Sequence, residues 1–376
     1  MKFSVSSALL QRQLAAISGV IMSNPVVPIL ENFLFELEDG KLTASASDLQ
    51  TSITTEIEVD TQDTGSVAVP AKILLDTLKS LPEQPVTFSI NEEHKSIEIT
   101  SNTGHYKLAG ENAEDFPKIP KADSKLSLTM SSDILGKAVG NTIFATSNDE
   151  LRPAMTGIFV EFQADKTTFV ATDGHRLIRY NRDDLIGGGD PMTMIIPKKS
   201  LGLLRATLPT EPAEVHTEFS ESNAFFSFDD IRMVCRLIDE RFPDYENAIP
   251  TENPNVLTID RVALLNSLKR LAIYANKSTN QIRLKMANEG TLQIFAEDLD
   301  FSNEANEALA CEYQGDDMEI GFNAKFVIEM LSNLTAKEIT IEMSTPNKAG
   351  IMKPTEKTDN GDILMLVMPV MLNTYA

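Results

Sequence analysis

The sequence has little of what disulfide-stapled, membrane-spanning or metal-binding proteins depend on. Its 376 residues include four histidines, no tryptophan and two cysteines, Cys235 and Cys311. The cysteines have no CxxC spacing, which argues against a disulfide framework and favours a reducing cytoplasm. No apolar run is long enough to span a bilayer. Residues 11–13 (QRQ) interrupt the N-terminal apolar run too early for a secretory signal, so we expect a cytoplasmic protein.

Positive charge is also scarce, and it is unevenly placed. The chain has 33 Lys and Arg against 55 Asp and Glu, a net charge of −22, which by itself argues against nucleic-acid binding. However, six predicted helical windows, 7–17, 71–81, 132–143, 197–208, 260–271 and 323–334, together carry +7. The rest of the chain must then carry −29, from −22 minus 7. The main contributors are Lys72, Lys79, Lys198, Lys199, Arg205, Lys269 and Arg270. These helix faces are either ordinary solvated faces or one surface that meets phosphates.

One sequence motif recurs at a fixed interval. Residues 170–177 read VATDGHRL, typical of a strand that ends in an Asp-Gly turn. Weaker copies are centred on Asp48 and Asp298, each 125 positions from Asp173. Proline-containing pairs repeat at intervals of 126: Phe116-Pro117, Phe242-Pro243 and Met368-Pro369. Several landmarks in one order predict a single module repeated three times.

Each module is predicted to contain two similar halves, each with one helix and several strands. Leu10, Leu14 and Ile17 form one apolar helical stripe, and a hairpin follows around Asp39-Gly40. A second helix opens in the middle of each module, as at Pro70. The predicted fold class is therefore α+β with three similar domains, at residues 1–124, 125–253 and 254–376.

These motifs resemble the bacterial DNA polymerase III beta subunit, the replicative sliding clamp, over essentially the whole chain. The matching segments are residues 1–3 (MKF), 28–30 (PIL), 171–177 (ATDGHRL), 241–245 (RFPDY), 319–323 (EIGFN) and 367–369 (VMP). The resemblance implies a DNA-clamp fold in a ring-shaped, head-to-tail homodimer. The ring would encircle double-stranded DNA without sequence specificity and tether the replicative polymerase. It would be a processivity factor with no catalytic site, cofactor or metal of its own, opened by a separate clamp loader.

The resemblance also implies a hydrophobic pocket for short peptides of polymerases, the clamp loader and repair polymerases, between domains 2 and 3. Carried onto this chain, the pocket would comprise Met155, Thr172, Gly174, His175, Arg176, Leu177, Pro243, Asn247, Val367, Met368, Pro369, Val370, Met371 and Leu372. Met and Leu would give an adaptable apolar floor, and His175 and Arg176 would hydrogen-bond the peptide at the rim. Without the resemblance, Met368 and Leu372 would be interpreted as ordinary core residues.

Some residues depart from the family pattern. Glu246-Asn247-Ala248 stands where members often carry basic residues, and Pro153-Ala154 stands where they carry aromatic ones, although Arg152 remains as a DNA contact. The tail 373–376 could overhang the pocket, and the polar segment 346–362 resembles an extended hairpin loop. Candidate apolar contacts of the dimer are Tyr106 and Leu108 near one end, with Ile273 and Tyr274 near the other.

Two other classes of protein compete with this interpretation. Asp173 beside His175 could suggest a hydrolase or nuclease, but no HExxH or Walker sequence accompanies them, and Asp173 suits a turn better. A non-ring scaffold of three modules in an open arc would bind proteins only. A closed ring would instead require the first module of one subunit to fit the third module of another.

Overall fold

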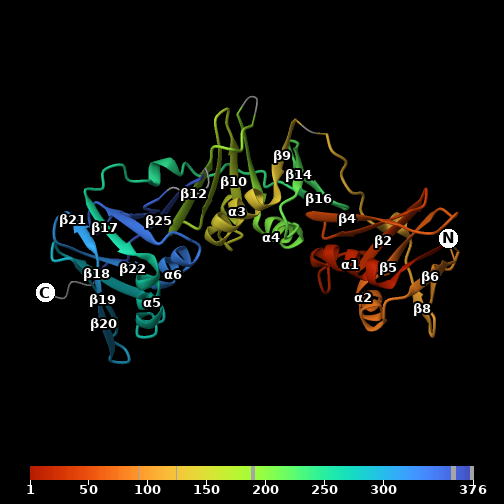
Figure 1. Ribbon diagram of the computed structural model, residues 1–376, viewed down its shortest axis with the longest axis horizontal. Helices are drawn as coiled ribbons and strands as arrows, with labels where there is room; N and C mark the ends of the chain where they lie inside the picture. The colour runs from red at the N-terminus through yellow and green to blue at the C-terminus, as the bar shows by residue number, and fades with distance from the viewer. Residues whose placement is uncertain (92, 124, 188–190, 357–360, 373–376) are drawn as a thin grey trace. The chain divides into compact units, whose positions relative to one another are not determined.

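The computed structural model describes every residue except 92, 124, 188–190, 357–360 and 373–376. The chain divides into two compact units, drawn in one ribbon in Figure 1. The N-terminal unit consists of Met1–Gly136 and Lys199–Leu237, and the C-terminal unit consists of Lys137–Lys198 and Ile238–Ala376. The predicted tail 373–376 and part of the predicted loop 346–362 lie outside the described residues.

The N-terminal unit contains two antiparallel sheets and a pair of helices. The eight-stranded sheet has the order β5 (Gly65–Pro70), β2 (Asn32–Glu38), β3 (Lys41–Ser47), β4 (Thr51–Glu58), β16 (Ile231–Arg236), β15 (Asn223–Phe228), β14 (Glu214–Phe219), β9 (Leu126–Ser131). The four-stranded sheet has the order β1 (Lys2–Ser6), β6 (Pro85–Ile90), β7 (Ser96–Thr100), β8 (His105–Ala109). Helices α1 (Ser7–Ile17) and α2 (Ala71–Ser80) pack on each other and on strands of the larger sheet, and α4 (Lys198–Thr207) begins at the border of the unit.

Apolar periodicity explains why these segments fold as they do. Leu10, Leu14 and Ile17 of α1 are fully buried, as the predicted stripe requires. The turn between β2 and β3 has positive φ at both Asp39 (50°) and Gly40 (78°), the combination that a two-residue type I′ hairpin needs. The sequence motif Asp-Gly therefore fixes the register of this hairpin.

The C-terminal unit repeats this plan. Its nine-stranded sheet has the order β13 (Met192–Pro197), β10 (Gly157–Phe162), β11 (Thr167–Thr172), β12 (Arg176–Arg182), β25 (Gly361–Val367), β24 (Gly350–Pro354), β23 (Glu338–Met343), β17 (Asn255–Asp260), β21 (Glu312–Gln314). Its four-stranded sheet has the order β20 (Asn303–Ala310), β19 (Thr291–Asp298), β18 (Gln281–Met286), β22 (Met318–Asn323). Helices α5 (Arg261–Leu271) and α6 (Ala324–Ser332) pack together, and α3 (Ser132–Thr142) begins at the border of the unit.

The α+β class and the predicted helices are confirmed. Asp260 caps α5, because its Oδ1 accepts a hydrogen bond of 2.7 Å from the Ala263 amide. The expectation that 346–362 is an extended hairpin loop is wrong in part. Within this segment, β24 lies between β23 and β25 and pairs with both. The segment 346–362 is therefore more than a hairpin loop.

The large sheets cross the predicted module borders. In the N-terminal unit β4 pairs with β16, and in the C-terminal unit β12 pairs with β25. Each pairing joins strands of two successive modules, so the division into three domains at 124 and 253 stays a prediction. Within the described part of the chain, no helix is long and apolar enough to cross a membrane.

Candidate functional site

The repeated Asp motif forms a tight turn between β11 and β12. The Asp173 carboxylate accepts hydrogen bonds from the amides of His175 (2.9 Å) and Arg176 (3.0 Å). Thr172 Oγ1 donates to the Arg176 carbonyl over 2.7 Å, and Gly174 takes a φ of 88°, which favours glycine. The carboxylate of Asp48 likewise accepts from the amides of Gln50 and Thr51. This geometry supports Asp173 as a turn residue rather than a catalytic one.

Arg176 is buried and connects this turn to two other elements. Its Nε donates to Asp173 over 3.1 Å, one Nη donates to Glu329 of α6 over 2.6 Å, and the other donates to the Phe144 carbonyl over 2.7 Å. Its guanidinium also lies 4.9 Å from the ring centre of Phe326. Three of the five N–H groups of Arg176 are therefore used inside the chain, and its hydrogen bond to a docked peptide stays a prediction.

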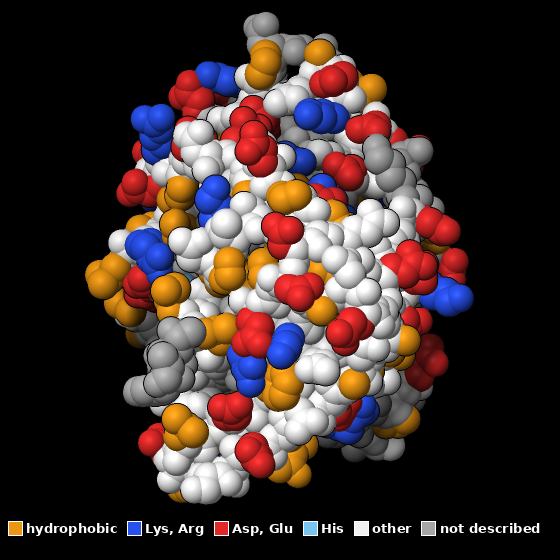
Figure 2. All heavy atoms as spheres, turned by 90° about the vertical axis from the view of Figure 1, so that its left-hand side faces the viewer, with side chains coloured by type: hydrophobic (Ala, Val, Ile, Leu, Met, Phe, Trp, Pro, Cys, Tyr) orange, Lys and Arg blue, Asp and Glu red, His pale blue; other side chains and the backbone are white. Residues whose placement is uncertain are grey.

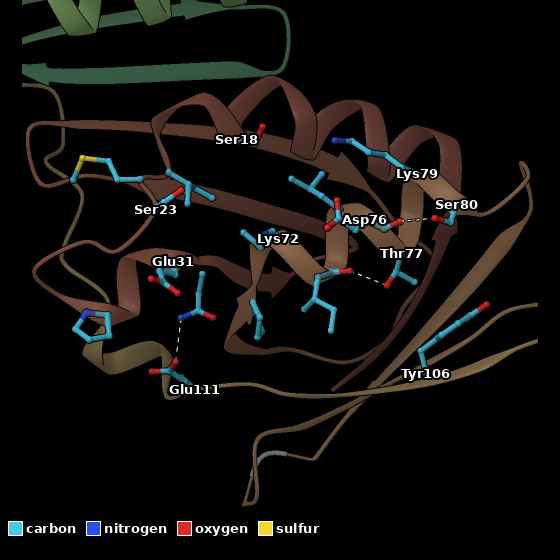
Figure 3. Close-up of a pocket in the computed structure, with 18 of the residues that line it drawn as sticks. Ser18, Ser23, Glu31, Lys72, Asp76, Thr77, Lys79, Ser80, Tyr106 and Glu111 are labelled. Carbon is cyan, nitrogen blue, oxygen red and sulfur yellow. Dashed lines mark hydrogen bonds between the residues drawn. The ribbon is translucent and has the colours of Figure 1, made fainter.

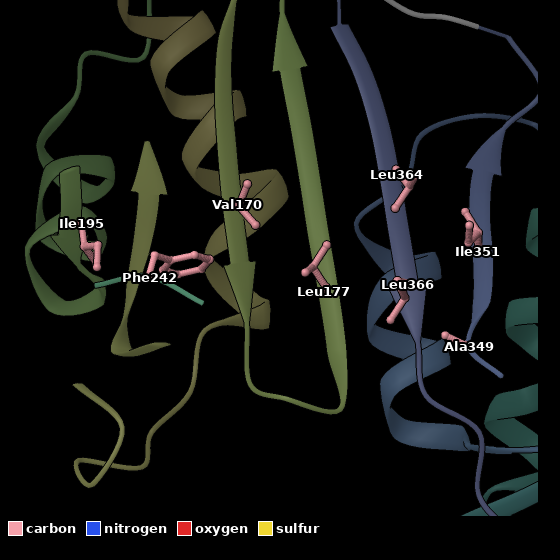
Figure 4. Packing of buried hydrophobic residues seen from close by; sticks show 8 residues of the cluster. All are labelled: Val170, Leu177, Ile195, Phe242, Ala349, Ile351, Leu364 and Leu366. Carbon is pink, nitrogen blue, oxygen red and sulfur yellow. The ribbon is translucent and has the colours of Figure 1, made fainter. Parts of the chain in front are cut away.

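A buried apolar cluster lies beside the turn, on one face of the nine-stranded sheet (Figure 4). The cluster consists of Val170, Leu177, Ile195, Phe242, Ala349, Ile351, Leu364 and Leu366, with Ala154, Phe159, Ile238, Tyr245 and Ile249 packed against it and partly buried. We call these residues the apolar floor. Because Leu177 and Leu366 are directly opposite in the register of β12 and β25, the floor is continuous across two strands.

The aromatic members form one wall of the apolar floor. The Phe159 and Phe242 rings are stacked with centres 4.8 Å apart, and Tyr245 lies 6.1 Å from Phe159. Burial, followed by the nearby Glu161 carboxylate, raises the pKa of Tyr245 to about 12. The phenol therefore stays neutral in the physiological range and can donate a hydrogen bond.

The C-terminal segment runs from the floor to another sheet. The Met368 amide donates to the His175 carbonyl over 2.8 Å, and the Val370 amide donates to the Gly321 carbonyl of β22 over 2.8 Å. A methyl group at Gly321 would lie 2.9 Å from a Leu372 side-chain carbon, so glycine lets the segment pack closely. Residues 370–372 therefore lie along β22.

The predicted pocket residues thus fall into three groups. Thr172, Leu177 and Val367 are buried in the sheet, as is Arg176. Gly174, His175, Asn247, Met368 and Met371 are exposed, and Met155, Pro243, Pro369, Val370 and Leu372 are partly buried. The His175 ring stacks on Phe326 at 6.1 Å, and the Asn247 amide donates to Asp244 over 2.7 Å.

The apolar floor also contains residues that the sequence prediction missed. Ala349, Ile351, Leu364 and Leu366 were not in the predicted pocket, although they make up much of the floor. The continuous apolar run 363–367 of β25 was the available signal for two of them, but such a run is equally typical of an ordinary core strand.

The predicted DNA-facing cations differ in their surroundings. Ion pairs hold three of them: Arg152 with Asp149, Lys199 with Asp48, and Arg270 with Glu307. Lys198 donates to the Asn148 side chain over 3.0 Å. Among the described residues, no ion pair is formed by the exposed side chains of Lys72, Lys79, Arg205 and Lys269. On the face drawn in Figure 2, acidic and basic side chains are interspersed.

Two of these lysines lie at a large cleft of the N-terminal unit. The cleft has a volume of about 1200 Å³ and is lined by α2, by residues of the segment 18–32 and by Tyr106. Figure 3 shows Lys72 and Lys79 on this helix together with the carboxylates of Asp76 and Glu31. The lining is therefore mixed in charge.

Arg152 occupies a different place from the helix cations. A methyl group at Gly174 would lie 2.9 Å from an Nη atom of Arg152. Arg152 therefore lies against the turn beside His175, at the edge of the candidate pocket.

The candidate dimer contacts are exposed only in part. Ile273 and Tyr274, just after α5, are 66% and 43% exposed, and Leu299 and Phe301 in the β19–β20 turn are exposed as well. Leu108, in contrast, is buried in its own sheet. It can offer little surface to a second subunit, whereas Tyr106 beside it is partly exposed.

The repeat creates an equivalent position in the N-terminal unit. There Phe116 packs on Leu34 and Ala68, as Phe242 packs in the apolar floor. A groove of about 870 Å³ separates residues 113–122 from the sheet. Ser45 and Thr54, hydrogen-bonded to each other over 3.0 Å, line this groove. The repeated position is thus polar in one unit and apolar in the other.

Repeated pairs of helix-and-sheet halves, with sheets that run across the module borders, define a DNA-clamp fold. Family models agree with this class along the chain. Residues 1–120 match the N-terminal domain of the DNA polymerase III beta subunit, residues 129–244 match its central domain, and residues 246–370 match its C-terminal domain.

Individual relatives agree as well. A beta sliding clamp of Pseudomonas aeruginosa is 28% identical over 99% of this chain and 100% of its own length. A beta sliding clamp of Synechococcus elongatus is 29% identical over 97% of this chain and 98% of its own length. The solved structure of a sliding clamp from Bartonella birtlesii, bound to griselimycin, superposes with a TM-score of 0.93 at 27% identity, covering 99% of this chain and 100% of that one.

The chain belongs to the DNA polymerase III beta subunit family, whose members are the sliding clamps of bacterial DNA replication. Its function is that of a DNA sliding clamp for the replicative polymerase.

Proposed function

We propose that two copies of this chain form a head-to-tail ring around duplex DNA, which the ring contacts without sequence specificity. Edge strands support this arrangement. β8 is the last strand of its sheet in the N-terminal unit, and β20 is the last strand of its sheet in the C-terminal unit. An exposed edge offers unpaired backbone groups to another chain. Exposed Ile273 and Tyr274 would add apolar contact beside Tyr106 of a second copy.

Small-angle scattering tests the ring directly. We expect a mass twice 41.4 kDa and a distance distribution with a central hole. Ile273→Asp should give a monomer, whereas Val262→Asp, at the other end of the same helix and also exposed, should leave the dimer intact. A wild-type monomer at micromolar concentrations would contradict the ring and favour the open scaffold.

The unpaired cations carry the proposed contact with DNA. Phosphates can be approached without breaking an internal ion pair by Lys72, Lys79, Arg205 and Lys269. Phosphate contacts permit sliding because they carry no sequence information.

The ring would be retained on DNA by topology, so closed circular DNA should remain bound at salt concentrations that release short linear duplex. Lys269→Glu should weaken linear-duplex binding and reduce its salt dependence, whereas Lys348→Glu, an exposed lysine on a loop of the same unit, should not. Equal salt sensitivity of circular and linear DNA would refute the topological mechanism.

The proposed docking site for short peptides of the replicative polymerase, the clamp loader and repair polymerases is the surface over the apolar floor. There the partly buried residues packed on the floor, such as Phe159 and Tyr245, adjoin exposed side chains. The observation that carries this proposal is the combination of a continuous apolar floor with the exposed residues His175 and Met368 at its edge. Griselimycin, which is bound to the Bartonella birtlesii clamp, is expected to bind this chain too.

Calorimetric titration with griselimycin and with polymerase-derived peptides tests the docking site. Met368→Glu should abolish peptide binding, whereas Ile186→Glu, an exposed aliphatic residue beyond the other end of β12, should not. Equal binding by both variants would contradict the assignment.

We further infer a cytoplasmic processivity factor without a catalytic site, built from three domains at 1–124, 125–253 and 254–376.

A further inference from the structure

Arg179 lies among residues of the apolar floor and forms no hydrogen bond or salt bridge with any residue that the structure describes. It is on β12, two residues beyond Leu177 and on the same face of the sheet. In the register, its neighbours on both sides are apolar, Val170 on β11 and Leu364 on β25. Both neighbours are buried members of the floor, and neither side chain can accept a hydrogen bond.

The guanidinium of Arg179 is already partly removed from water. Its Nε is buried and has no hydrogen-bond partner. Within the part of the chain that the structure describes, Arg179 forms neither a hydrogen bond nor a salt bridge. A buried donor without an acceptor is costly, and the cost is recovered when an acceptor arrives. The terminal nitrogens are not among the buried atoms, so an acceptor from outside can reach the guanidinium there with little further loss of hydration on the protein side.

The equivalent position of the N-terminal unit shows what a satisfied site looks like. There Thr54 occupies the place of Arg179, and its cross-strand neighbour Ser45 replaces Val170. Those two hydroxyls hydrogen-bond each other over 3.0 Å. At the same place the C-terminal unit has no internal acceptor and has a larger donor, which points to an acceptor from outside the chain.

We propose that Arg179 determines specificity by binding a carboxylate side chain of the docked peptide, next to the residues that fill the apolar floor. The proposal rests on the peptide-docking function proposed above. A carboxylate suits the site because its two oxygens match the planar fork of a guanidinium. The neighbouring Tyr245 is surrounded by the carboxylates of Glu161, Asp244 and Glu246, which repel a peptide carboxylate. A peptide carboxylate therefore gains binding energy only where it contacts Arg179 directly.

The test uses the full-length chain and a defined series of probes. The probes are acetylated, amidated hexapeptides with two leucine anchors and a guest residue, Asp, Asn or Ala, moved through the remaining positions. At one position the Asp guest is expected to bind about tenfold more tightly than the Asn guest, the effect of one charge-assisted hydrogen bond. Arg179→Gln should remove this preference, so that the Asp and Asn guests bind with equal affinity, and Arg179→Lys should retain part of it.

The controls separate failure of this inference from failure of the docking site. Arg152→Gln, which changes the other arginine at the edge of the pocket, should leave the Asp preference intact. If no leucine-anchored probe binds the wild-type chain, the docking site itself is wrong and the role of Arg179 falls with it. If the probes bind but show no Asp preference, or if the preference survives Arg179→Gln, the docking site stands and the role of Arg179 is refuted.

Discussion

The strongest prediction about stability concerns Arg176. Replacing it with methionine keeps much of the side-chain volume but removes three hydrogen bonds, to Asp173, Glu329 and the Phe144 carbonyl. Asp173 and the carbonyl would be left without this partner. The Glu329 side chain is 46% exposed and can return to water, which lowers the cost. We expect Arg176→Met to reduce the free energy of unfolding of the C-terminal unit by about 2–4 kcal/mol.

Urea denaturation followed by far-UV circular dichroism measures this loss, because the chain has no tryptophan to report unfolding. Hydrogen exchange of fragments from β11 and β12 assigns the loss to the C-terminal unit. The matched control is Arg232→Met on β16, whose side chain is 69% exposed and forms one ion pair with Glu56. It should cost no more than about 1 kcal/mol. Equal losses for the two variants would refute the view that Arg176 is a buried connection.

Three further predictions concern other parts of the chain. Gly321→Val should release the C-terminal segment from β22, since a Cβ at this position would lie 2.5 Å from the Val370 carbonyl oxygen; faster proteolysis of the C-terminus checks this. Burial raises the pKa of Cys235 to about 12, so its thiol should resist iodoacetamide until the protein unfolds, as mass spectrometry can show. The hydrogen bond from Arg270 lowers the pKa of Glu307, so the pair stabilises the fold above the ordinary value near 4.5, and this contribution is lost as pH falls through the lower, folded value. Glu307→Gln should flatten this acid limb of thermal stability, and an unchanged limb would count against the pair.

Local patterns predicted the helices and turns well. The stripe Leu10, Leu14 and Ile17 and the Asp-Gly pairs carry their information within a few residues, so periodicity and turn chemistry suffice. The strand β24 was missed because its buried residues, Gly350 to Met352, are a short apolar stretch within a polar segment. A run this short cannot be distinguished from a loop without knowing its neighbours.

The candidate site was harder to predict because long-range contacts decide its chemistry. The resemblance placed Arg176 at the rim of the pocket. In the structure its side chain is buried and donates to Glu329, which is 153 positions away in the chain. Leu364 and Leu366 are typical of an ordinary buried strand, and only their pairing with β12 places them in the apolar floor.

The polar groove of the N-terminal unit has a consequence for the choice of docking site. A repeated module yields two successive junctions with matching strand pairings, so a docking surface at one junction has a counterpart at the other. The hydrogen-bonded hydroxyls of Ser45 and Thr54 make the N-terminal counterpart polar where the C-terminal one is apolar. Apolar residues at these two positions would remove this difference and offer partners a second, competing docking site.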